Sequence, residues 1–133
     1  MAITQVTTPL IADNAITRVK LASQYTAINA LGSSSGDVTL DFSLYNTFTL
    51  TLAGLTTLNI TNAKVGDVKT ILIEGDSSSS VYFPAGSQMF YVVSGALDNT
   101  SSTNFIQIEC VDDSPALPVF YLSISQGTFA VGL

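Results

Sequence analysis

Residues 39–61, TLDFSLYNTFTLTLAGLTTLNIT, decide the fold class. Within this stretch apolar residues alternate with Thr, Asp or Asn in three runs, which are Leu40 and Phe42; Phe48, Leu50 and Leu52; and Leu58 and Ile60. A period of two is typical of half-buried strands, because successive side chains point to opposite faces of a sheet. The stretch therefore predicts antiparallel β-strands.

More strands are expected on the C-terminal side. Residues 68–74 (VKTILIE) have an apolar centre, Ile71-Leu72-Ile73, which indicates burial on both faces of the sheet. Shorter apolar runs follow at 81–83, 89–93, 104–110, 119–125 and 128–131, separated by polar or proline-containing turns. Many short strands without helical stretches between them predict an all-β fold, an antiparallel β-sandwich or jelly-roll-like domain over residues 36–133.

The N-terminal part of the chain has a different pattern. Its apolar residues do not alternate strictly; they include Leu10, Ile11, Ile16, Val19 and Leu21. The run Gly32-Ser33-Ser34-Ser35-Gly36 that follows has the composition of a flexible connector. We therefore expect residues 1–35 to form an N-terminal arm and linker that precede the β-domain.

Composition excludes several classes of function. Only 11% of the 133 residues are charged, against about 25% in ordinary soluble domains, so much of the surface is expected to meet other protein. The net charge is -6 and the four cations form no basic run, which argues against binding to nucleic acid. No apolar stretch is long enough to insert into a membrane, and the N-terminus does not have the pattern of an export signal.

Nothing in the sequence marks a catalytic site. The chain contains no His, which excludes every mechanism that uses an imidazole base, and no motif accompanies the lysines. The close carboxylate pairs, Glu74 with Asp76 and Asp112 with Asp113, fall at expected strand ends, where they are solvated turn residues or, alternatively, ligands of a calcium ion. Cys110 shares its parity with Ile106 and Ile108 and is expected in the core. We predict no enzyme activity, no cofactor and no metal site.

Two segments resemble structural proteins of bacteriophages. Residues 11–22 (IADNAITRVKLA) resemble the ITxxKLA segments of phage tail fibres. Residues 36–76 are similar to β-rich modules of tail-fibre, head-fibre and capsid-decoration proteins in the order of Asp41, Asn46, Phe48, Gly54, Thr57, Leu58, Asn62 and Gly66. The resemblance implies a protein of the virion surface that is made in the host cytoplasm.

The resemblance also implies how such a protein works. The arm would dock on the major capsid or tail proteins through Leu10, Ile11, Ile16, Val19 and Leu21, and the β-domain would form a homotrimer. The size of the chain favours a capsid decoration or head-fibre protein. The alternative is a receptor-binding tail-fibre or tail-tip module that recognises a glycan or protein of the host surface. Tyr45, in the expected turn 43–46, is the exposed aromatic residue predicted to contact a partner.

Overall fold

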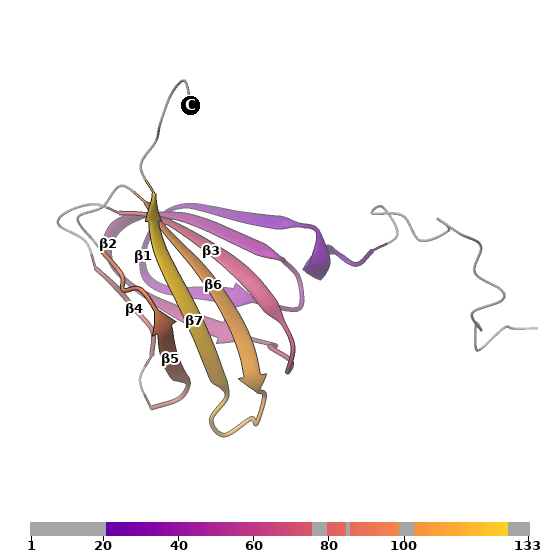
Figure 1. Ribbon diagram of the computed structural model, residues 1–133. Coiled ribbons are helices and arrows are strands. Elements are labelled where there is room, and N and C mark those ends of the chain that lie inside the picture. The colour runs from indigo at the N-terminus through magenta and orange to yellow at the C-terminus, as the bar shows by residue number, and fades with distance from the viewer. Residues whose placement is uncertain (1–20, 76–79, 85, 99–102, 128–133) are drawn as a thin grey trace, which may run out of the picture.

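The computed structural model describes residues 21–75, 80–84, 86–98 and 103–127, and these residues form an almost purely β structure (Figure 1). A short 3-10 helix, η3 (Ser23–Tyr25), precedes the strands β1 (Ile28–Asp41), β2 (Thr47–Thr61), β3 (Val68–Glu74), β4 (Val81–Tyr82), β5 (Met89–Ser94), β6 (Thr103–Asp112) and β7 (Val119–Gly127). The all-β prediction is confirmed. The described part of the chain has no helix long and apolar enough to cross a bilayer.

The strands form one mixed sheet in the order β1-β2-β3-β6-β7-β5, with β4 pairing with β2. Four pairings are parallel, namely β1–β2, β2–β3, β2–β4 and β5–β7. Only β3–β6 and β6–β7 are antiparallel. The prediction of an antiparallel arrangement is therefore wrong for most pairings, because alternation shows which side chains face the core but not the direction of the neighbouring strand.

Strands β1 and β2 are parallel neighbours although only the short segment 42–46 connects them. A parallel pair normally needs a crossover of about a dozen residues or more. Here Ile28 pairs with Thr47 and Leu40 pairs with Ile60, so the end of β1 must return close to its own beginning. The bent strand itself is the crossover, and Figure 1 shows both strands curving back in this way.

Glycines allow the bend in β1. The β1–β2 register shifts between Ala30 and Gly32 and again between Ser34 and Gly36. Gly32 and Gly36 have φ values of 66° and 71°, a left-handed conformation that costs glycine the least. Residues 32–36, expected to be a linker, lie inside β1 instead. The division into an arm and a domain stays a prediction.

The bend in β2 contains a buried polar residue. Thr56 is fully buried, and its hydroxyl shares its one proton between hydrogen bonds to the carbonyl oxygens of Ser34 (3.1 Å) and Gly54 (3.0 Å). The first of these bonds joins the bend of β2 to the bend of β1. A buried hydroxyl must be satisfied in this way, so Thr56 holds the two bends together at little cost.

The core lies between the two halves of the bent strands β1 and β2. It consists of Leu40, Phe42, Phe48, Leu50, Leu52, Leu58, Ile60, Ile71, Ile73, Val81, Ile106, Ile108, Cys110, Phe120, Leu122 and Ile124. The Phe42 ring, directly after β1, stacks on Phe48 (centroids 5.9 Å apart) and meets the edge of Phe120 (6.1 Å). The expected burial of Cys110 is confirmed. Burial, together with the nearby charge of Asp113, raises the pKa of its thiol.

A side chain extends the β2 ladder beyond the short strand β4. The Gln88 amide nitrogen donates to the carbonyl oxygen of Ile60 (2.5 Å), and its amide oxygen accepts from the N–H of the same residue (3.3 Å). One side chain thus replaces a backbone partner at this position. The predicted C-terminal strands are found with ends shifted by one or two residues, and the predicted strand 128–131 lies outside the described residues.

The close approach of β5 and β7 gives a testable prediction. Gly95 follows β5 with a φ of 76°, and a Cβ atom there would lie 1.8 Å from the carbonyl oxygen of Ile124. Gly95→Ala must displace β7, so we expect it to lower the free energy of unfolding by at least about 2 kcal/mol. Urea denaturation followed by circular dichroism measures this change.

The matched control is Gly86→Ala. Gly86 also has a positive φ, 94°, but its Cβ would meet open space. Gly86→Ala therefore has only the conformational cost of a positive φ, which should lower the free energy of unfolding by about 1 kcal/mol. Equal losses in the two variants would contradict the close packing of β5 on β7.

Candidate functional site

The docking residues predicted for the arm mostly lie outside the described residues. These are Leu10, Ile11, Ile16 and Val19, whereas Leu21 is described and exposed. Tyr45 is half buried, and its ring meets the edge of Phe48 with centroids 6.0 Å apart. Tyr45 therefore packs partly on the core, and its contact with a partner stays a prediction.

The structure shows a surface that the sequence analysis did not single out. Side chains of β3, β5, β6 and β7 that point away from the core form it, and we call it the outer face. Its exposed large apolar residues are Val68 (51% exposed), Met89 (37%), Tyr91 (49%), Val93 (64%), Phe105 (42%) and Tyr121 (45%). Single exposed apolar residues are common, but a gathering of this kind on one sheet face usually marks a binding surface.

Strand register arranges the outer face in rows. One row, at the β3 start, contains Val68, Glu109, Tyr121 and Tyr91. The next contains the uncharged polar residues Thr70, Gln107 and Ser123, and the third contains Leu72, Phe105 and Ser125. The outer face therefore has an aromatic end and a second apolar region, with a strip of neutral hydrogen-bonding groups between them.

The aromatic end is held together by its own contacts. The rings of Tyr91 and Tyr121 meet edge to face with centroids 5.6 Å apart. The Tyr91 hydroxyl lies 3.0 Å from the sulfur of Met89. Tyrosines present a large apolar ring with a polar tip, which suits a surface that is wet when free and covered when bound.

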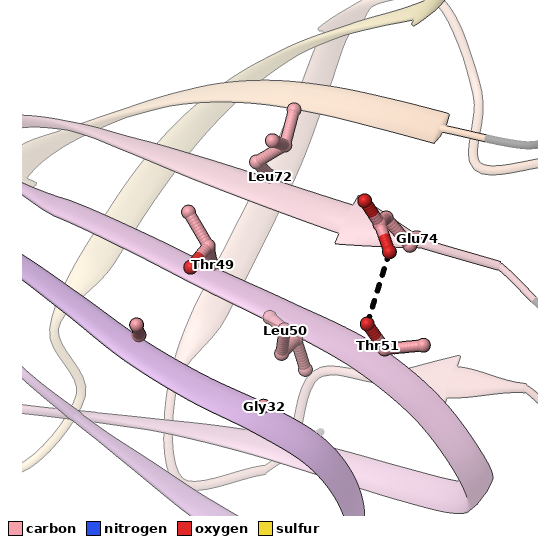
Figure 2. A pocket seen from close by; sticks show the side chains of 7 residues that line it. Gly32, Thr49, Leu50, Thr51, Leu72 and Glu74 are labelled. Carbon is pink, nitrogen blue, oxygen red and sulfur yellow. Dashed lines mark hydrogen bonds between the residues drawn. The ribbon is translucent and has the colours of Figure 1, made fainter.

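Two shallow hollows lie on this side of the sheet. One lies beside Tyr121, between Val68 and Val93. The other continues the outer face onto β2 and β1, where Thr49 and Leu72 project from the same side of the sheet (Figure 2). The Thr51 hydroxyl donates to a carboxylate oxygen of Glu74 (3.1 Å) at the border of this second hollow.

The acidic residues serve mainly as turn caps. Asp112 accepts bonds from the N–H and hydroxyl of Ser114, which lower the pKa of its carboxyl. Burial alone would raise the pKa of Asp41, but hydrogen bonds from Ser43 and Asn62 outweigh it and lower that pKa. Among the described residues no three acidic or cysteine side chains gather as metal ligands.

Lys69 is a buried cation that sequence reasoning missed. It is 2% exposed, and its ammonium donates to the carbonyl oxygen of Gln24 (2.6 Å). The rings of Tyr25 and Phe42 each lie with their centroid 5.9 Å from the nitrogen. Burial lowers the pKa of Lys69, and the charge of Asp67 opposes this only in part. The sequence does contain a signal for this burial, because Lys69 alternates in step with Ile71 and Ile73 and so faces the same side of β3.

Lys69 anchors the N-terminal end of the described chain. Its bond to Gln24 holds η3 against the sheet, directly before β1. The chain therefore enters the domain at a defined place, next to the aromatic ring of Phe42.

Comparison with known proteins adds no relative. No family model, curated protein or solved structure matches the chain. Its function must be inferred from the geometry above.

The burial of Lys69 makes stability depend on pH. Because its pKa is lowered in the folded state, the unfolded chain binds more protons in the window below the ordinary value of 10.5. We expect the free energy of unfolding to rise as the pH increases through the folded pKa toward 10.5, an increase that Lys69→Met does not share. Urea denaturation at a series of pH values measures it.

Lys64→Met serves as the control, since the Lys64 side chain is 80% exposed and lies 3.9 Å from Asp113. This variant should retain the pH-dependent gain of the unaltered protein. If Lys69→Met retained the gain as well, the ammonium of Lys69 would not be the group that titrates.

Proposed function

We propose that the protein is a structural component of a bacteriophage virion, a capsid decoration or head-fibre protein that acts through protein–protein contacts. The observation that carries the proposal is the outer face, a broad surface of exposed apolar and aromatic side chains on a domain with few charges. A surface of this kind is suited to binding protein and not to chemistry. The phage origin rests on the resemblance of residues 11–22 and 36–76 to phage structural proteins.

In this proposal the arm and the domain have separate tasks. The arm docks on the major capsid or tail proteins at the virion surface through Leu10, Ile11, Ile16, Val19 and Leu21. The Lys69 bond to Gln24 supports this task, because it fixes one part of the arm, the helix η3, against the sheet. The sandwich-like β-domain associates as a homotrimer, which multiplies weak docking contacts through avidity.

A second candidate function is supported by the exposed tyrosines. Tyr82, Tyr91 and Tyr121 are each about half exposed, and aromatic rings of this kind stack on sugar rings or on protein. A tail-fibre or tail-tip module that binds a glycan or protein of the host surface would use such residues. The two functions differ in copy number, since decoration needs many copies for each particle and receptor binding needs few.

Quantitative mass spectrometry of purified particles tests the proposal. In virions of the phage that encodes the chain, we expect copies in a fixed ratio to the major capsid protein, as a repeated lattice position requires. A handful of copies for each particle would instead support the tail module. Absence from the particles would contradict both functions.

The same measurement tests the arm. Ile16→Asp combined with Val19→Asp places charges in the proposed docking surface, and the number of copies should fall about tenfold or more. Thr17→Asp is the control, since it adds a charge to the same segment without removing an apolar side chain. Equal incorporation of the two variants would show that the arm does not dock.

A further inference from the structure

We propose that the outer face is the surface through which one copy of this protein binds a second copy. The inference rests on the proposed function, because it names the subunit contact of the proposed oligomer. Its main residues are Val68, Tyr91, Val93, Phe105 and Tyr121. Three properties of the outer face identify the partner as a second copy: its charge, its area and its shape.

Charge favours the outer face over the rest of the surface. Each copy has a net charge of -6, so two copies repel one another unless they meet through a region that holds few charges. Two carboxylates of the outer face are Glu74, at one end, and Glu109, which lies in the aromatic row between Val68 and Tyr121. The rows between these two acids are neutral, so Thr70, Gln107 and Phe105 can be covered by a second copy without burying a charge, provided that the Glu109 carboxylate keeps its contact with water.

The area is close to what a stable contact between subunits needs. Aromatic side chains bury 150–250 Å² each and the aliphatic ones less, so the half-exposed residues of the outer face together present on the order of 500 Å² of apolar surface. The strip of Thr70, Gln107 and Ser123 adds polar surface between them. A standard interface buries about 800 Å² on each partner, so the outer face together with its rim is large enough.

The outer face has both projecting rings and hollows. Phe105 and Tyr121 project from neighbouring strands, while hollows lie beside Tyr121 and beside Leu72. Around a three-fold axis the contact is heterologous, so a projecting ring at the Tyr121 end of one copy can enter the hollow beside Leu72 of the next copy. The neutral strip between the two ends offers Gln107 and the hydroxyls of Thr70 and Ser123 for hydrogen bonds across the contact.

Analytical ultracentrifugation of the full chain over a range of concentrations tests this proposal. The unaltered protein should have a mass that is a multiple of 14.0 kDa. Phe105→Ser combined with Tyr121→Ser should raise the dissociation constant at least about a hundredfold, because both rings lie in the buried part of the contact. Circular dichroism confirms that the variant is folded.

Two further variants keep the test decisive. Leu55→Ser combined with Tyr82→Ser removes apolar side chains that are 62% and 55% exposed but lie off the outer face, and the mass should not change. Ser123→Glu adds one charge to an exposed position in the neutral strip and should dissociate the oligomer without affecting the fold.

The outcomes separate this inference from the proposed function. If both double variants dissociated equally, or if the outer-face variants stayed oligomeric, the contact would lie elsewhere. A protein that is monomeric at all concentrations, yet present in virions in many copies, would overturn the inference and the homotrimer but leave the proposed virion role intact. A protein that forms oligomers through the outer face but is absent from virions would support the inference and contradict the proposed function.

Discussion

The structure depends on one constraint, the return of β1 and β2 upon themselves. Each strand bends near its middle, and the parallel register is kept on both sides of the bend, from Ile28 with Thr47 to Leu40 with Ile60. Because both halves direct their apolar side chains inward, the bend places Leu40 and Leu58 in the same core as Leu50 and Ile71. Without the bend, these residues would lie on one face of an extended sheet that is open to water.

The outer face follows from this construction. Once the core has been closed by the bent strands, β3, β6 and β7 present their other side away from it, and alternation along these strands leaves Phe105 and Tyr121 exposed. The same geometry gives Lys69 an inward position on β3, where its bond to Gln24 secures η3. The anchor of the N-terminal segment and the proposed subunit contact thus lie on opposite sides of one strand.

The sequence analysis predicted the all-β class, most strand positions and the burial of Cys110, because alternation directly reports which side chains face a core. It did not predict parallel pairing, since the same alternation suits either direction. Gly32 to Gly36 was interpreted as a linker, because glycine provides the same freedom to a linker and to a strand bend. The exposed aromatics were missed for a related reason: periodicity does not show which face of a strand remains uncovered. Of the predicted docking residues, only Leu21 lies in the described part of the chain.

Engineered disulfides test the bent parallel pair most directly. In a Cys110→Ala background, Thr39→Cys with Asn59→Cys joins register partners, whose Cα atoms in adjacent strands lie about 5 Å apart, within the reach of a disulfide. Thr39→Cys with Thr49→Cys instead joins positions that would face each other in a simple hairpin with the connection 42–46; here Thr49 pairs with Ala30 and Leu72. Peptide mapping under non-reducing conditions should find a rapid bridge in the first variant only. A bridge in the second variant and none in the first would contradict the fold on which the core and the outer face depend.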